Sequence, residues 1–309
     1  MPAPHRHAIA VAPGRGGTWI HDAVISAGGA ITEPGEASGL VWTRSDRPDA
    51  LAEMISQCPQ LGWVQLPFAG VDPYLALIRA NPAILWTCGK GVYSEPVAEH
   101  ALGLALAGLR NLAAYARAHT WGAGAGTNLL GARVVVLGAG GITRSFLRLL
   151  EPFHCHVTVV RRRPEPLAGA DAVVTMDGLD QALEGADLVV LALALTPDTE
   201  GVLDRRRLEL LAPHAWVVNV ARGAHVVTDD LVAVLAERRI GGAALDVTDP
   251  EPLPDGHPLW EEPRCLITPH TANTAEMAVP LLGARVSDNV RRWIAGDDLV
   301  GSVDAEAGY

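Results

Sequence analysis

Short, continuous runs of apolar residues, many of them β-branched, recur through the second half of the chain. The runs cover residues 133–137, 157–160, 187–195, 215–220, 242–247 and 264–268. Runs of this length are typical of strands that are buried on both faces of a parallel sheet. Helical spacing of apolar residues follows several of them, notably at 228–238 and after the strand at 133–137, where the apolar positions are Phe146, Leu147, Leu149 and Leu150. The alternation predicts an α/β fold with a doubly wound parallel sheet.

The first part of the chain shows the same alternation over shorter elements. Strand-like runs at 8–11, 40–43 and 61–66 alternate with helix-like segments at 19–27 and 49–58. Signals for nucleotide binding are weak here, so this region is predicted to form a separate, smaller α/β domain. After it, a long amphipathic helix is expected to begin at Pro96 and to run to about His119.

The strand at 133–137 passes through a glycine-rich turn directly into a helical pattern. Gly138, Gly140 and Gly141 stand in this turn. Glycines let the backbone turn sharply and approach a pyrophosphate, which the first amides of the helix and their dipole then attract. Thr143 replaces the third glycine of the usual motif, so the turn alone also fits an ordinary strand-to-helix connection. The strand and the helix around it favour dinucleotide binding.

Polar residues stand at or just past the ends of four predicted strands, namely Thr196, Arg222, Asp246 and His270. Their spacings of 26, 24 and 24 residues match a regular strand–helix repeat. The carboxyl ends of parallel strands share one edge of the sheet, and ligands bind outside that edge. We therefore expect these side chains to face the same crevice as the glycine-rich turn.

Three residues near this edge suit the reduction of a 2-oxo acid. A histidine is the usual proton donor at neutral pH, and a neighbouring carboxylate favours its protonated form and fixes its tautomer. Glu251 lies in a stiff, proline-bounded loop after the strand at 242–247, so it could reach His270. Arg222 offers a two-pronged grip on a carboxylate or on the carbonyl beside it. Each residue also has a simpler interpretation, as a capping or core histidine, a solvated loop glutamate and a surface-turn arginine.

Composition excludes several classes of protein. The chain has 309 residues, of which 49% are apolar, enough for two domains with buried cores. Its net charge of −11 argues against a general nucleic-acid-binding protein. Four scattered cysteines fit a reducing cytoplasm, and neither a signal peptide nor a membrane span is indicated. No metal site is expected, because the adjacent His154, Cys155 and His156 would alternate between the two faces of a strand.

A series of motifs in this order resembles those of the D-isomer-specific 2-hydroxyacid dehydrogenase family over nearly the whole chain. The motifs lie at 68–72, 96–101, 137–142, 218–223, 244–247 with 250–253, and 268–272. Several motifs in the right order are far more specific than any one of them. The resemblance implies two Rossmann-like domains. Residues 1–95 and 284–309 would form a discontinuous substrate-binding domain, and residues 96–283 the NAD(P)-binding domain.

The resemblance also implies roles for single residues. Arg222, Glu251 and His270 would form the catalytic trio. The backbone amides around Ala69, Gly70 and Val71 would hold the substrate carboxylate, and Asp246 would contact the nicotinamide amide. The remaining cofactor-binding residues would be Gly138, Gly140, Gly141, Ile142, Thr196, Ala221 and Thr271. Candidates for shaping the substrate pocket are Trp42, Phe68, Tyr93 and Trp260.

The end of the strand at 157–160 bears on the choice of cofactor. NAD-preferring members of the family carry an acidic residue there, whereas this chain has Arg161, followed by Arg162 and Arg163. An arginine can pair with the 2′-phosphate of NADP, so NADP(H) is the preferred cofactor, with NAD as the alternative. A solvated basic turn would explain the same residues without any ligand.

Together these features predict a cytoplasmic NAD(P)H-dependent reductase of small 2-oxo acids, similar to the glyoxylate/hydroxypyruvate reductase branch. The resemblance also implies a homodimer formed through the long helix after Pro96. A non-catalytic NAD(P)-binding sensor of the corepressor type remains an alternative, because fold alone does not decide function. Enzymes similar to D-3-phosphoglycerate dehydrogenase, or of the formate or phosphite type, are further alternatives; Glu251 argues against the formate type, which has glutamine there.

Overall fold

The computed structural model describes residues 6–14, 17–44 and 47–306. Its contacts divide the chain into two compact units, one formed by residues 1–93 and 274–309 and the other by residues 94–273. The first boundary lies two residues before the expected one. The second lies ten residues earlier than expected, because helix α11 (Ala275–Ala295) is continuous and the hydroxyl of Thr274 caps its start by accepting a hydrogen bond from Met277.

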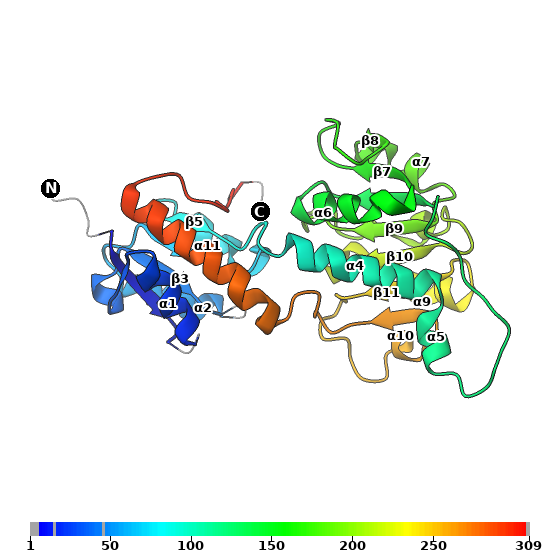
Figure 1. Ribbon diagram of the computed structural model, residues 1–309, viewed down its shortest axis with the longest axis horizontal. Helices are drawn as coiled ribbons and strands as arrows, with labels where there is room; N and C mark the ends of the chain where they lie inside the picture. Colours follow the sequence, from blue (N-terminus) through cyan, green and yellow to red (C-terminus); the bar gives the residue numbers. More distant parts are fainter. Residues whose placement is uncertain (1–5, 15–16, 45–46, 307–309) are drawn as a thin grey trace. The chain divides into compact units, whose positions relative to one another are not determined.

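The larger unit contains a seven-stranded sheet in the order β12-β11-β10-β9-β6-β7-β8, as predicted for a doubly wound fold (Figure 1). All neighbouring strands in it are parallel. The strands are β6 (Arg133–Leu137), β7 (His156–Val160), β8 (Ala172–Val174), β9 (Leu188–Leu191), β10 (Trp216–Asn219), β11 (Gly242–Leu245) and β12 (Cys265–Ile267). The helices are α4 (Ser94–Leu109), α5 (Leu112–Ala116), α6 (Gly141–Leu150), α7 (Leu179–Leu183), α8 (Arg205–Leu208), α9 (Thr228–Ala236) and α10 (Pro258–Glu261).

Helices cover both faces of this sheet, which explains why its strands read as unbroken apolar runs. Val134 and Val136 of β6 belong to a core shared with α4 and α6, whereas Val135 and Leu137 belong to a second core that includes α7, α8 and α9. Successive side chains of a strand point to opposite faces, so a strand buried on both sides must be apolar at every position.

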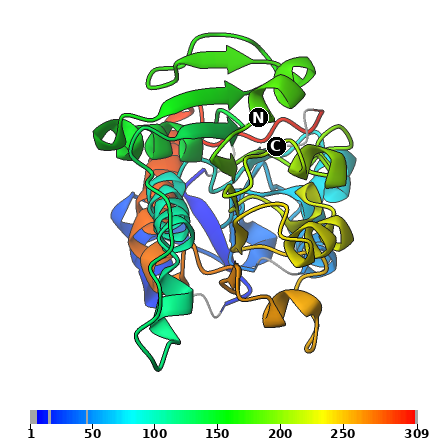
Figure 2. The same cartoon turned by 90° about the vertical axis from the view of Figure 1, so that its right-hand side faces the viewer.

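The long helix expected after Pro96 is shorter than predicted. Helix α4 ends at Leu109, and Asn111 adopts a left-handed conformation with φ of 57° before the short α5. Asparagine tolerates this conformation better than most residues, so it interrupts a pattern that periodicity alone extends to His119. The segment after α5 leaves the helices of this unit as an extended loop (Figure 2).

The smaller unit is a second α/β structure, built on a five-stranded parallel sheet in the order β2-β1-β3-β4-β5. Its strands are β1 (Ala8–Ala12), β2 (Ala30–Ile31), β3 (Gly39–Trp42), β4 (Trp63–Gln65) and β5 (Leu85–Thr87). Its other helices are α1 (Thr18–Ser26), α2 (Pro48–Ser56) and α3 (Leu75–Ala80). Helices α1 and α11 pack over one face, through Ile20, Val24, Val286 and Val290.

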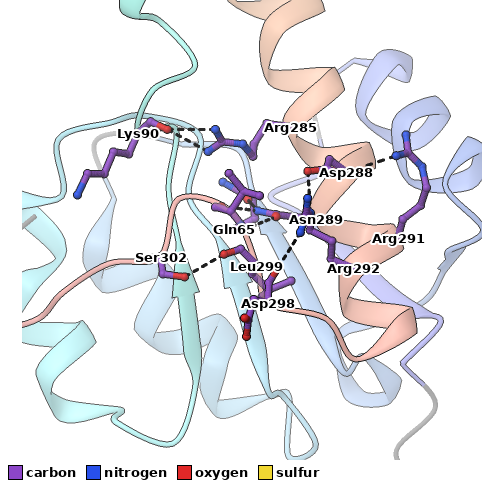
Figure 3. Close-up of polar contacts among 11 residues, drawn as sticks. Gln65, Lys90, Arg285, Asp288, Asn289, Arg291, Arg292, Asp298, Leu299 and Ser302 are labelled. Atoms are coloured by element: carbon purple, nitrogen blue, oxygen red, sulfur yellow. Dashed lines mark hydrogen bonds and ion pairs between the residues drawn. The ribbon is translucent and has the colours of Figure 1, made fainter. Parts of the chain in front are cut away.

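A buried polar contact ties α11 to the end of β4 (Figure 3). The side-chain amide of Asn289 donates to Oε1 of Gln65 at 2.8 Å, and both residues are fully buried. Asn289 also exchanges hydrogen bonds of 2.8 and 2.9 Å with the backbone of Val300. Because buried polar groups are costly unless paired, this network fixes α11 and the C-terminal segment against the strand that leads to the 68–72 motif.

None of the helices in the described part of the chain combines the length and the hydropathy that a membrane span requires.

Candidate active site

The glycine-rich turn between β6 and α6 has the shape that a bound phosphate requires. Gly138 has φ of 105°, and a Cβ built on it would lie 2.2 Å from the carbonyl oxygen of Ala192. A Cβ on Gly140, in contrast, would meet no atom within 4 Å, so this side of the turn is open. Helix α6 begins at Gly141, so its first backbone amides lie next to the open side of the turn. The turn therefore fits the pyrophosphate of a dinucleotide, with Ile142 in the first turn of the helix.

Thr143 stands where a third glycine is usual, yet the turn accommodates it. The residue is fully buried, and its hydroxyl donates a hydrogen bond of 3.0 Å to the carbonyl oxygen of Gly138. The larger side chain therefore packs between α6 and the turn and adds a hydrogen bond that holds the two together.

Arg161 follows β7 and is held by a nearby acid. Its guanidinium donates to the backbone oxygen of Glu165 at 3.3 Å and to Oε2 of the same residue at 3.4 Å. The Glu165 side chain is 61% exposed and the contact is long, so this is a weak surface pair. Arg162 is exposed beside it. Arg161 thus lies at the strand end, with a side chain that is 20% exposed.

His270 and Glu251 form the most specific contact at this edge of the sheet. Nδ1 of His270 lies 2.7 Å from Oε1 of Glu251. An ionised carboxylate only accepts hydrogen bonds, so Nδ1 carries the proton of this bond, and Nε2 remains for another partner. The two side chains are 56% and 42% exposed, respectively, so they are accessible to a small ligand. The predicted pairing of these two residues is present in the structure.

The backbone around His270 is unusual. Its φ is 52°, in the left-handed region, and its amide donates to the carbonyl oxygens of Asp246 at 2.8 Å and Thr268 at 2.9 Å. A left-handed non-glycine residue persists only where its surroundings hold it, and such residues gather at functional sites. Here the carboxylate of Asp246 holds the turn by accepting the amides of Thr271 at 2.8 Å and Ala272 at 3.0 Å.

Arg222 follows the end of β10, the strand beside β11. Its Nη1 donates to the carbonyl oxygen of Ala221 at 2.7 Å, and its side chain is partly exposed. A Cβ on the next residue, Gly223, would lie 2.0 Å from the carbonyl of Thr248, so glycine is required for the two loops to approach so closely. The loop of Arg222 therefore packs directly against the loop that leads to Glu251.

Two residues that support the Arg222 loop were not identified as functional from the sequence. Asn219 accepts the amide of Ala221 at 3.0 Å and donates to the carbonyl oxygen of Arg222 at 2.8 Å. His225 is fully buried, with Nδ1 3.2 Å from the amide nitrogen of Arg222 and Nε2 3.3 Å from the carbonyl oxygen of Ala194. A polar residue at the end of a buried strand is the signal that could have identified Asn219.

The loop after β9, which contains Thr196, lies against the glycine-rich turn. A Cβ on Gly138 would come within 3.0 Å of Leu193 of this loop. The amide of Thr196 donates to the hydroxyl of Thr199 at 2.8 Å, and that hydroxyl donates in turn to the carbonyl oxygen of Ala194. These hydrogen bonds fix the conformation of the loop beside the candidate phosphate site.

The predicted carboxylate loop lies in the smaller unit. Among the described residues, none accepts a hydrogen bond from the amides of Ala69, Gly70 or Val71. The loop is braced from behind, because the amide of Gly89 donates to the carbonyl oxygen of Phe68 at 2.7 Å. Free, fixed amides of this kind are suitable donors to a carboxylate.

Tyr93 and Arg285 complete the support of this loop. The Tyr93 hydroxyl donates to the carbonyl oxygen of Pro67, and burial raises the pKa of Tyr93 to about 12, so the hydroxyl keeps its proton. Arg285 on α11 donates to the carbonyl oxygen of Lys90 at 3.1 Å (Figure 3). It also donates to the carbonyl oxygen of Cys88 at 3.0 Å. Burial lowers the pKa of Arg285, but the guanidinium stays charged at neutral pH.

No group of three or more His, Cys, Asp or Glu side chains within residues 6–14, 17–44 and 47–306 is arranged to hold a metal ion.

The chain is similar in sequence to proteins of one known family. The family described as "D-isomer specific 2-hydroxyacid dehydrogenase, NAD binding domain" matches residues 102–272. An uncharacterised protein of Corynebacterium melassecola is 39% identical over 253 residues, which are 80% of this chain and 83% of that protein. Glyoxylate/hydroxypyruvate reductase A of Serratia proteamaculans is 36% identical over 177 residues, just over half of each chain (56% and 55%).

Solved structures extend the likeness to both units. A D-isomer-specific 2-hydroxyacid dehydrogenase from Xanthobacter autotrophicus, solved with NADPH and MES, has a TM-score of 0.84 and 28% identity. The match covers 98% of this chain and 99% of that one. An NADPH-dependent glyoxylate/hydroxypyruvate reductase from Sinorhizobium meliloti, solved with NADP and sulfate, has a TM-score of 0.81, 26% identity and the same coverage. The chain therefore belongs to the D-isomer-specific 2-hydroxyacid dehydrogenases, a family of NAD(P)-dependent oxidoreductases.

Proposed function

We propose that this protein is an NADPH-dependent reductase of small 2-oxo acids such as glyoxylate or hydroxypyruvate. The observation that carries the proposal is the 2.7 Å contact between His270 and Glu251 at the carboxyl edge of the same sheet as the glycine-rich turn. The Serratia and Sinorhizobium proteins, both glyoxylate/hydroxypyruvate reductases by name, support the choice of substrate.

Each residue has a defined part in this reaction. A bound NADPH supplies the hydride that C2 of the oxo acid accepts. His270 donates a proton from Nε2 to the carbonyl oxygen, since its Nδ1 is engaged by Glu251. Glu251 accepts a hydrogen bond from Nδ1 and so fixes the orientation of the ring. Arg222 orients the substrate through its carboxylate or the adjacent carbonyl, and the amides of residues 69–71 bind the carboxylate.

Residues at the sheet edge would hold the cofactor. The turn at Gly138, Gly140 and Gly141, which is open at Gly140, fits its pyrophosphate. Ile142, Thr196 and Ala221 would line the cofactor cleft. Asp246 and Thr271 would lie near the nicotinamide. The carboxylate of Asp246 has room for only limited further contact, because both of its oxygens already accept backbone amides.

The proposed preference for NADPH predicts a switch of cofactor in the Arg161→Asp variant. Aspartate would repel the 2′-phosphate and accept hydrogen bonds from the ribose hydroxyls of NAD. We expect the ratio of kcat/KM for NADPH over NADH to fall by at least about tenfold, the effect of roughly one charged hydrogen bond. Steady-state kinetics with both cofactors measure the ratio. Arg163→Asp is the matched control, and an equal fall in both variants would mean that only overall charge matters.

The support of the carboxylate loop predicts an effect on substrate binding alone. In Tyr93→Phe the carbonyl oxygen of Pro67 loses its hydrogen bond from a side chain whose pKa of about 12 keeps it a donor. We expect KM for the 2-oxo acid to rise about three- to tenfold, with the Kd of NADPH unchanged. Kinetics and fluorescence titration separate the two quantities, and an unchanged KM would show that the loop needs no support from Tyr93.

We also propose that the protein is a homodimer. Apolar side chains are exposed on α5 and in the segment after it, including Leu112, Tyr115 and a fully exposed Trp121. Exposed apolar groups of this kind mark interaction surfaces. Light scattering coupled to size-exclusion chromatography should give twice the chain mass for the wild type and a smaller value for Leu112→Asp with Trp121→Ser. A monomeric wild type would contradict this.

A substrate panel tests the function itself. We expect absorbance at the nicotinamide band to fall when NADPH is mixed with the protein and glyoxylate or hydroxypyruvate, and to fall more slowly with NADH. Phosphorylated and bulky 2-oxo acids serve as comparison substrates. Tight NADPH binding without oxidation by any 2-oxo acid would instead support the non-catalytic sensor.

A further inference from the structure

His100 on α4 makes two contacts that the proposed reaction does not yet use. Its Nε2 lies 3.0 Å from the hydroxyl oxygen of Thr268 and 3.3 Å from Oδ1 of Asp246. The same hydroxyl donates to Oδ1 of Asp246 at 2.6 Å. A hydroxyl has one proton, so a hydroxyl that donates to Asp246 can only accept from His100. Nε2 of His100 therefore carries a proton, and the chain of donors runs from His100 to Thr268 to Asp246.

Asp246, which accepts the last of these hydrogen bonds, holds the turn of His270 on both sides. Oδ1 of Asp246 accepts the Thr268 hydroxyl, two residues before His270, and the amide of Thr271, directly after it. Oδ2 accepts the amide of Ala272 at 3.0 Å. The Asp246 side chain is 2% exposed, so these bonds are protected from competition by water. The left-handed backbone of His270 lies between these anchor points.

The contacts among His100, Thr268 and Asp246 also join the beginning and the end of the larger unit. Helix α4 begins at Ser94, which is the first residue of that unit, and the last residue of the unit is Asn273. His100 and Ala272 therefore lie close to the two ends of the unit's chain, and both contact the carboxylate at the end of β11. A substitution in α4 would thus act on the turn of His270 through two side chains.

We infer that His100 is a positioning residue for the reaction, and that it acts through Thr268 and Asp246 on the orientation of His270. This inference rests on the proposed function. His100 does not touch the reacting atoms; its donor proton keeps the Thr268 hydroxyl directed at Asp246. Without that proton the hydroxyl can rotate, Asp246 loses a bond, and the turn becomes free to move. A displacement of about 1 Å at a reacting group can lower turnover about a hundredfold.

Two substitutions of His100 separate positioning from packing. The amide nitrogen of glutamine can take the place of Nε2 as a donor, so His100→Gln should keep at least about a third of the wild-type kcat. His100→Leu has similar bulk and no donor, so its kcat should fall about ten- to a hundredfold while the Kd of NADPH changes less than about threefold. Thr268→Val removes the hydroxyl between His100 and Asp246, so its kcat should fall about as much as that of His100→Leu. The variant that combines Thr268→Val with His100→Leu should have a kcat only slightly lower than either single variant.

The kinetic isotope effect distinguishes a loss of alignment from a loss of folded protein. With NADPH that carries deuterium at the transferred position, the isotope effect on kcat should rise in His100→Leu, because a misaligned His270 makes the chemical step slower. The melting temperature and the NADPH Kd are recorded for each variant. Parallel losses in the glutamine and leucine variants, at an unchanged isotope effect, would overturn the inference and assign His100 to packing. Wild-type kinetics in His100→Leu would also overturn it.

An NMR measurement tests the inference without any turnover. In protein labelled with ¹⁵N-histidine, the His100 ring should show a protonated Nε2, and Thr268→Val should shift the ring signals of both His100 and His270. His156, exposed at the start of β7, should not respond. A His100 ring protonated only at Nδ1, or a His270 signal insensitive to Thr268→Val, would contradict the chain of hydrogen bonds. A wild-type enzyme without activity on any 2-oxo acid would refute the proposed function while leaving this measurement interpretable.

Discussion

In the His270→Ala protein, turnover of a 2-oxo acid should fall by about two to four orders of magnitude, with NADPH affinity largely kept. General acid catalysis by a positioned side chain contributes this much to a reaction rate. The ring is positioned by Glu251 at 2.7 Å and by a turn that Asp246 holds, so no other side chain takes its place easily. Steady-state kinetics give kcat, and fluorescence titration gives the Kd of NADPH.

The matched control is His156→Gln. His156 is an exposed histidine at the start of β7, the end of the strand opposite to the site, and its replacement should leave kcat within about twofold of wild type. Wild-type turnover in His270→Ala would remove His270 as the proton donor. A loss of NADPH binding as large as the loss of turnover would point instead to a collapsed cofactor site.

Arg222→Lys should lower kcat/KM for the 2-oxo acid by about two orders of magnitude or more, although the charge is kept. A guanidinium binds a carboxylate or a carboxylate–carbonyl pair through two parallel N–H groups, whereas an ammonium is a single point charge on a flexible stem. The loss of alignment alone accounts for a factor of this size. The loop should keep its shape, because Gly223 packs against Thr248 and the side-chain amide of Asn219 donates to the carbonyl oxygen of Arg222.

Arg239→Lys provides the comparison for this substitution, because Arg239 is exposed just past the end of α9, away from the carboxyl edge of the sheet. Its kinetics should match wild type. Full activity in Arg222→Lys would show that the residue contributes only packing and charge, and the proposed orientation of the substrate would have to be assigned to the residue 69–71 amides alone.

The regular spacing of strand ends makes much of the site predictable from the sequence. Residues separated by about one strand–helix repeat emerge at the same edge of a parallel sheet, so Arg222, Asp246 and His270 can be grouped by their spacing alone. The pairing of Glu251 with His270 follows from a short loop of limited freedom. The glycine-rich turn is predictable because close approach and a positive φ leave few other residues possible.

Other features depend on contacts that no local pattern reveals. His100 reads as one polar position on an amphipathic helix, and only the fold shows that it meets Thr268, 168 residues further along the chain. His225 ends a short 3-10 helix (Gly223–His225), and its role follows from three contacts of its ring with backbone atoms of Arg222 and Ala194. The early end of α4 at Leu109 depends on a left-handed Asn111, a backbone state that apolar periodicity does not encode.

The boundary between the units shows the same limit. A sequence pattern locates the last strand of the larger unit well but not the point at which contacts change from one core to the other. The hydroxyl of Thr274 caps α11 by accepting from Met277, and the helix that follows belongs to the smaller unit from its first turn. A threonine before an amphipathic run is a recognisable cap, although several such candidates occur in any chain of this length.

The most direct test of the proposed reaction follows the transferred hydrogen. Hydroxypyruvate is reduced in ordinary water with NADPH that carries deuterium at the transferred position of C4, and the glycerate formed is examined by mass spectrometry and proton NMR. We expect one deuterium per product molecule, bound at C2, and the same labelling at a far lower rate in His270→Ala. Product hydrogen at C2 derived from water, or no product despite tight NADPH binding, would contradict the proposed hydride transfer.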